Sequence, residues 1–191
     1  MSADAAVSTT PTTAPGAAVR ARAPRPERVQ VQAPEGFEAL DRTHREVQAV
    51  LVRFSELLDH VDDNGPDEAA RRMAAEIRSF FEGHARQHHA DEERLVFPAL
   101  LISGDADLVH HVKRLQQDHG WLEEDWLELA PQIEAIEKGY NWYDLPMLRH
   151  ALPVFAALYD EHIVLEESVV YPAAKRHQQA LADGVAARTG G

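Results

Sequence analysis

Two stretches of the sequence share one arrangement of histidine and glutamate that suits a metal site. HHADEERLVFP covers residues 88–98 and HIVLEESVVYP covers residues 162–172. Both read His, three residues, Glu, Glu, three residues, an aromatic residue and Pro. Residues four apart lie on one face of a helix, about one turn apart. Each stretch therefore presents an imidazole beside a carboxylate, and these donors suit iron, manganese or zinc.

Two further histidines extend the pattern into an internal repeat. His44 and His119 each lie alone on an apolar helical stripe. From His44 to His88 is 44 residues, and from His119 to His162 is 43. We therefore expect the first two helices to repeat as the last two. Such a repeat can relate the two halves by a pseudo-twofold axis, and a site on that axis would take equivalent ligands from each half.

The side chains of this pattern replace apolar residues in the core stripes, as His119 does between Leu115 and Leu122. Burying Glu92 and Glu166 in an apolar bundle costs on the order of several kcal/mol each. Two divalent cations, bridged by the glutamates and held by two histidines each, remove this cost. Six ligands are too many for one tetrahedral zinc, and they leave open positions on two octahedral metals. The predicted metal ligands are His44, His88, Glu92, His119, His162 and Glu166.

The second helix offers a competing pair of ligands. His89 and Glu93 repeat the same spacing one position later. The apolar stripe of this helix favours His88 and Glu92 as the inward-facing pair. Glu93 and Glu167 are then expected on the flank, either as hydrogen-bond acceptors for the ligands or as solvated charges.

Four other side chains are weaker candidates for the same site. His84 lies near the same face of the second helix, but its counterpart in the repeat is Leu158, so a symmetric ligand set excludes it. Glu123 follows His119 by four residues and is an alternative third carboxylate. Tyr159 and Tyr171 lie near the site residues of the fourth helix, where we expect core packing, with metal ligation as the alternative.

Apolar residues at steps of three and four predict four amphipathic helices that would carry these side chains. We expect the helices over about 36–61, 65–101, 106–137 and 141–181. Asn141 or Asp144 would cap the fourth helix, and Pro131 would kink the third. Four such helices with short connections predict an all-α, up-down-up-down four-helix bundle.

The two ends of the chain differ from its centre in composition. Residues 1–34 are rich in Ala, Thr, Pro and Arg, and we expect them to form a disordered tail. The bundle domain is expected over 35–182 and a flexible C-terminal tail over 183–191. A length of 191 residues suits one domain with tails.

Charge and composition narrow the classes of partner. A formal net charge of −13 argues against nucleic acid and anionic membranes as partners. The sequence has no cysteine, which excludes iron–sulfur clusters, zinc ribbons and thiol nucleophiles. No apolar run reaches the roughly 18 residues of a membrane-spanning helix. The N-terminus lacks the order of a secretory signal, so we expect a cytoplasmic protein.

A lone His followed by His-x-x-x-Glu, twice over four helices, resembles the hemerythrin-like (HHE cation-binding) family. The Glu-Glu-x-x-x-aromatic-Pro stretch after each pair strengthens the resemblance, which covers about residues 38–178. The resemblance implies a hemerythrin-like bundle around two non-haem, carboxylate-bridged iron ions. The animal oxygen carriers of the family use five His, a Glu and an Asp. This chain resembles the bacterial branch with four His and two Glu.

The resemblance also implies what meets the metal. Dioxygen, hydrogen peroxide and nitric oxide are the expected small-molecule partners, and catalase-like dismutation of peroxide is one expected activity. The alternative is a sensor of iron, oxygen or nitric oxide, or an iron store, that acts through a protein partner or an oligomer. A metal-free helical interaction module is the third alternative, and the sequence leaves all three open.

Overall fold

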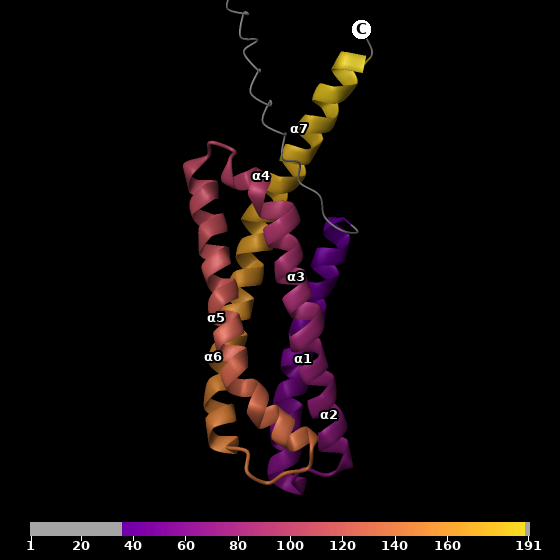
Figure 1. The fold of residues 1–191 in the computed structure, drawn as a ribbon, viewed down its shortest axis with the longest axis vertical. Coiled ribbons are helices and arrows are strands. Elements are labelled where there is room, and N and C mark those ends of the chain that lie inside the picture. The colour runs from indigo at the N-terminus through magenta and orange to yellow at the C-terminus, as the bar shows by residue number, and fades with distance from the viewer. Residues whose placement is uncertain (1–35, 190–191) are drawn as a thin grey trace, which may run out of the picture.

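Long helices lie side by side in the computed structural model, which describes residues 36–189 (Figure 1). The chain forms successive helical segments, some of which contain several helices. The first segment is the single helix α1 (Phe37–Asn64), and the third is the single helix α5 (Ala106–Glu137). The second segment runs through α2 (Glu68–Ser79), η1 (Phe80–Ala85), α3 (Arg86–Asp91), η2 (Glu92–Val96) and α4 (Phe97–Leu101), where η denotes a π-helical stretch. The fourth runs through α6 (Leu145–Leu165), η3 (Glu166–Val170) and α7 (Tyr171–Thr189). The predicted all-α, up-down-up-down bundle is confirmed.

Local capping groups begin and end these segments. Asp67, Asp105 and Asp144 each accept a hydrogen bond from a backbone N–H of the first helical turn, at 2.8, 3.0 and 2.9 Å. Such bonds satisfy N–H groups that have no partner inside the helix. Gly65 and Gly139 follow helix ends with φ of 70° and 74°, a conformation that glycine adopts without strain. Short connections then make neighbouring segments antiparallel.

The observed ends differ from the sequence prediction at the fourth segment. Asp144, and not Asn141, is its cap. Its last helix continues to Thr189, although the sequence predicts an end near residue 181 and a flexible tail over 183–191. This stretch is rich in alanine, and the hydrogen bonds of a helix are local, so the helix continues beyond the bundle (Figure 1). The predicted disordered tail over 1–34 lies outside the described residues.

Two apolar clusters fill the bundle and leave a polar layer between them. One cluster contains Phe54 and Ile133, and the other contains Phe97 and Leu115. On each of the four segments, buried polar side chains lie between the first cluster and the second. α5 stays continuous through Pro131, and its last turns run obliquely across the lower end of the bundle (Figure 1). The buried polar residues are His44, His88, Glu92, Asp118, His119, His162 and Glu166.

Two π-helical stretches begin at the polar layer. η2 starts at Glu92 and η3 starts at Glu166, which is the same point in the internal repeat. A π-turn holds one residue more than an α-turn and so redirects the side chains around it, and such turns occur often at functional sites. The apolar periodicity of the sequence did not predict them, because it cannot separate one wide turn from a local irregularity in the pattern.

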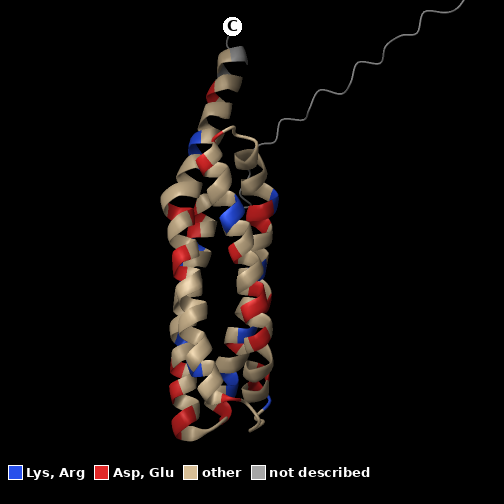
Figure 2. Cartoon of the chain, turned by 90° about the vertical axis from the view of Figure 1, so that its left-hand side faces the viewer, with Lys and Arg blue, Asp and Glu red and all other residues tan. Residues whose placement is uncertain are grey.

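Acidic side chains cover the outside of the bundle. Asp and Glu lie along its whole length, with fewer Lys and Arg among them (Figure 2). This distribution agrees with 32 acidic and 19 basic residues in the sequence. Within residues 36–189, no helix is both long enough and apolar enough to cross a membrane.

Candidate metal centre

The six predicted ligands meet at the centre of the bundle. All four segments contribute, and none of the six side chains is more than 6% exposed. The two glutamates are fully buried, at 0% exposure. The i, i+4 spacing places each glutamate one turn from a histidine on the same segment. The lone histidines come from the neighbouring segments: His44 lies on α1 and His119 on α5.

The six residues form two overlapping groups of potential ligands. Atoms of His44, His88, Glu92 and Glu166 all lie within 4.8 Å of one another. The second group, with the same spacing, is Glu92, His119, His162 and Glu166. Both glutamates belong to both groups. Each group could hold a metal ion, and the two groups share both carboxylates.

The two oxygens of Glu166 face opposite groups. Its Oε2 lies 3.1 Å from His44 Nε2, and its Oε1 lies 3.2 Å from His162 Nε2. Glu92 Oε2 lies 3.5 Å from Nε2 of His88 and 3.5 Å from Nε2 of His119. Glu166 thus turns one oxygen towards each group, whereas Glu92 turns the same oxygen towards both.

Several atoms at this centre lack a hydrogen-bond partner within the described residues. They are His88 Nδ1, Glu92 Oε2, both carboxylate oxygens of Glu166, His119 Nε2 and both ring nitrogens of His162. Nε2 of His44 also lies only 3.0 Å from Nε2 of His88, where at most one proton can lie between them. Buried lone pairs without partners are costly, and a cation satisfies several of them at once. The donor set therefore fits metal ions.

Burial and charge set opposite pKa shifts at the two glutamates. Burial, together with repulsion from Glu166, raises the pKa of Glu92 to about 7. Burial opposes ionisation of Glu166 as well, but the positive charge that His162 and His44 bring within 3.2 and 3.1 Å of its oxygens lowers its pKa well below the ordinary value. In turn, although burial disfavours its charge, Glu166 raises the pKa of His162 to about 10. Without a metal, a proton on His162 therefore takes the place of a cation.

At His88, unlike at His162, burial outweighs the attraction of the nearby carboxylates. Burial lowers the pKa of His88 to about 3, so its imidazole is neutral at physiological pH. A neutral imidazole has a free lone pair and is the form that binds metal.

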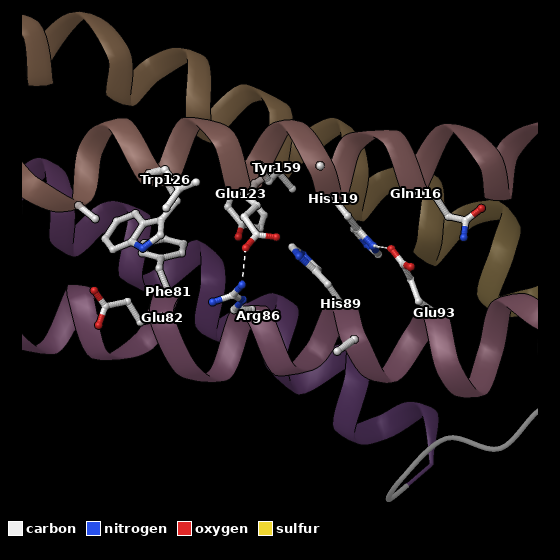
Figure 3. Close-up of a pocket in the computed structure, with 15 residues that line it drawn as sticks. Phe81, Glu82, Arg86, His89, Glu93, Gln116, His119, Glu123, Trp126 and Tyr159 are labelled. Carbon is white, nitrogen blue, oxygen red and sulfur yellow. Dashed lines mark hydrogen bonds and ion pairs between the residues drawn. The ribbon is translucent and has the colours of Figure 1, made fainter.

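Each lone histidine is oriented by a glutamate from the opposite half of the repeat. His44 Nδ1 lies 2.9 Å from Glu167 Oε1, and His119 Nδ1 lies 3.0 Å from Glu93 Oε1 (Figure 3). With the Nδ1 proton donated to a carboxylate, Nε2 keeps its lone pair and points inward. Glu93 and Glu167 therefore act as hydrogen-bond acceptors, the first of the two roles that the sequence left open.

Tyr171 makes the two ends of the centre different. Its hydroxyl donates a short hydrogen bond to Glu92 Oε1 and lies 3.3 Å from His44 Nε2. Its ring stacks on His44 with centroids 5.5 Å apart, just as the ring of its repeat counterpart Phe97 stacks on His119 at 5.7 Å. The sequence favoured core packing for Tyr171, and the structure adds a polar contact with the centre at the His44 end.

Asp118 is a buried acid beside the centre that sequence reasoning missed. It is 1% exposed, and its Oδ2 lies 3.8 Å from His162 Nδ1 and 3.7 Å from Arg114 Nε. Its charge therefore favours a proton or a cation at His162. The signal in the sequence is an aspartate directly before His119 in an apolar stripe, where the first half has Thr43.

The weaker candidates take other places. His84 is exposed on η1 and contacts the edge of the Phe80 ring. Glu123 is 49% exposed and forms an ion pair with Arg86 on the neighbouring segment. His89 stacks on the ring of His119, with centroids 4.1 Å apart. It belongs to neither of the two ligand groups that contain Glu92 and Glu166. Tyr159 is 4% exposed and packs among aromatic rings.

Replacing Glu92 by glutamine should stabilise the metal-free protein by about 1–3 kcal/mol at pH 8, because one of two buried negative charges is removed. The raised pKa means that ionisation of Glu92 destabilises the fold as pH rises from 4.5 towards about 7. This gain in the free energy of unfolding should therefore vanish below about pH 4.5. Urea unfolding of both proteins with a chelator present, at pH 8 and below about pH 4.5, measures the difference. The exposed variant Glu123→Gln is the control, and equal effects of the two substitutions would contradict the prediction.

Comparison with known proteins agrees with this centre. The family model described as the hemerythrin HHE cation binding domain matches residues 34–174. The chain is also 30% identical to an uncharacterised protein of Haemophilus influenzae over 133 residues, which is 70% of this chain and 75% of that protein. The buried histidine and glutamate groups fit the cation binding after which the family is described. The chain belongs to the hemerythrin HHE cation-binding domain family.

Proposed function

We propose that the centre holds two iron ions and that a small molecule, either dioxygen, hydrogen peroxide or nitric oxide, binds or reacts there. The observation that carries the proposal is the pair of overlapping ligand groups that share Glu92 and Glu166. Two histidines would complete each position: His44 and His88 at one, and His119 and His162 at the other. The oxygen and nitrogen donors suit iron, and two carboxylates offset part of the charge of two divalent ions.

The side chains around the ligands support redox chemistry in a closed setting. The apolar clusters above and below the polar layer keep bulk water away from it. Glu93 and Glu167 hold the imidazoles of His119 and His44 in fixed orientations. The Tyr171 hydroxyl supplies a proton-bearing group beside Glu92. Bound iron would supply electrons and open coordination positions, and the protein would supply geometry and exclusion of water.

Iron analysis tests the ligand assignment. We expect about two iron ions per chain after anaerobic reconstitution, and about one or fewer in His119→Ala, because that position would lose one of its two histidines. His84→Ala removes an exposed histidine from outside the centre and should retain the wild-type iron content. Full retention of iron in His119→Ala would contradict the assignment of His119 as a ligand.

Iron affinity should fall as pH falls. In the metal-free protein the pKa of His162 is raised to about 10, so a proton must leave this imidazole before it can bind iron at neutral pH. We expect proton release on binding and about a tenfold loss of apparent affinity between pH 8 and pH 7. The loss should be steeper below neutrality, where Glu92, with its pKa of about 7, also binds a proton that iron must displace. Calorimetric titration in buffers of different ionisation enthalpy measures both quantities. Affinity that is constant between pH 6 and 8 would rule out His162 as a ligand that exchanges a proton for metal.

Addition of hydrogen peroxide to the iron-loaded protein separates the activities. Rapid evolution of oxygen, lost in His119→Ala and kept in His84→Ala, would indicate peroxide dismutation. A stable complex with dioxygen or nitric oxide, without turnover, would instead indicate a sensor or store that acts through a protein partner. Protein that takes up no iron, manganese or zinc would refute the metal centre itself.

A further inference from the structure

A cavity of about 650 Å³, the α3–α5 cavity, lies between the second segment and α5, and His119, a proposed ligand, lies in its wall (Figure 3). The buried apolar residues Phe81, Leu122 and Trp126 also line it, as does His89. Exposed charged side chains, Arg86, Glu93 and Glu123, line its solvent side. His119 is 6% exposed, and its Nε2 has no hydrogen-bond partner within the described residues. The cavity wall thus includes a histidine whose buried Nε2 lacks a partner.

Two polar pairs join the second segment to α5 at the edge of this cavity, one from Arg86 on α3 and one from Glu93 on η2. Arg86 Nη2 donates to Glu123 Oε1 at 2.5 Å, and Glu93 Oε1 lies 3.0 Å from His119 Nδ1. Figure 3 shows His89 between the two pairs, pointing from α3 towards α5. Both pairs hold the two helices at a fixed separation. They therefore fix the width of the space around His89, and neither pair occupies that space.

Gly120 lines the cavity directly after His119. It lies inside α5 with ordinary helical backbone, where glycine is less favourable than alanine. A Cβ atom built on Gly120 would meet no heavy atom within 4 Å, so packing does not require glycine. Gly120 is exposed, so a larger side chain at this position would extend into the open side of the cavity. The counterpart of Gly120 in the other half of the repeat is Arg45.

His89 also breaks the internal repeat. Its counterpart is Ile163, which is 3% exposed and belongs to the apolar core. One ring nitrogen of His89 lies within 4.8 Å of nitrogens of His119 and His162, yet His89 is in no group with the glutamates. Within residues 36–189 its imidazole makes no hydrogen bond. It thus stands between the cavity and one proposed cation position, with a polar group free to meet a third molecule.

The opposite end of the centre is built differently. Beside His44, the Tyr171 ring is 1% exposed and lies parallel to the imidazole at 5.5 Å. A smaller depression of about 290 Å³ lies between α1 and α3 and includes His88 in its wall. Its volume is smaller than that of the α3–α5 cavity, and its wall contains neither His119 nor His89.

We propose that small molecules reach the centre through the α3–α5 cavity and bind at the His119 and His162 position, where His89 donates a hydrogen bond to them. This inference rests on the proposed metal centre. The incoming molecules are small, bind a metal through the lone pair of one atom, and accept a hydrogen bond at another atom. The two proposed metal positions are then unequal, and only one of them receives the incoming molecule.

The first experiment narrows the cavity and measures entry. Gly120→Leu places a side chain in the open space, whereas Arg45→Leu places the same side chain at the repeat-related position on α1. With iron-loaded protein and azide as the probe, stopped-flow absorbance should give an association rate at least about tenfold lower for Gly120→Leu, because entry through a narrowed passage is slower. Arg45→Leu should stay within about twofold of wild type. An unchanged rate in Gly120→Leu with full iron content overturns the proposed route.

The second experiment removes the hydrogen-bond donor. His89→Ala should weaken azide binding about tenfold, mainly through faster dissociation, while the iron content stays that of wild type. His84→Ala, which removes an exposed histidine from the same helical segment, should change neither quantity. Loss of iron in His89→Ala would make His89 a ligand and overturn the proposal, as would unchanged azide affinity.

The two proposals fail in different ways. Wild-type protein that binds no metal refutes the metal centre. A different outcome is that wild type, Gly120→Leu and His89→Ala all have normal iron content and the same azide association rate and affinity. That result leaves the metal centre intact and refutes only the proposed route and the role of His89.

Discussion

Two carboxylates buried at the middle of an apolar bundle are the constraint on which the rest of the structure depends. Glu92 and Glu166 are fully buried, and their ion-pair partners are histidines. Each charge removed from water costs on the order of several kcal/mol unless something offsets it. Apolar cores on both sides hold the helices in place although the layer between them is polar. The fold is therefore arranged so that a cation, or a proton where no cation is bound, must complete its centre.

The internal repeat explains why the centre contains two overlapping groups of potential ligands. Each half contributes one lone histidine and one His-x-x-x-Glu pair, and both groups contain the two glutamates. The outer hydrogen bonds cross between the halves, because Glu167 orients His44 and Glu93 orients His119. Loosening one half would therefore disturb the imidazole orientation in the other. This coupling makes the centre a property of the whole bundle.

Departures from the repeat give the two ends of the centre different surroundings. The first end has the Tyr171 hydroxyl, where the second end has the Phe97 ring. The second end has Asp118 and the α3–α5 cavity. A symmetric framework thus supplies the ligands, and a few substitutions supply polarity and access. Such inequality is what a centre needs if one position is to hold its coordination while the other exchanges a small molecule.

The sequence by itself determined the helical segments, their order and the six inward-facing residues. Apolar periodicity and i, i+4 spacing are local, so they can be read along a single helix. Only the tertiary structure decided which neighbouring side chains make hydrogen bonds with the six residues. The Tyr171 hydroxyl meets Glu92 across 79 residues, and Glu93 meets His119 across 26. Contacts of this kind depend on the register at which packed helices face each other, and the π-helical stretches shift that register after Glu92 and Glu166. The periodicity within one helix does not encode it.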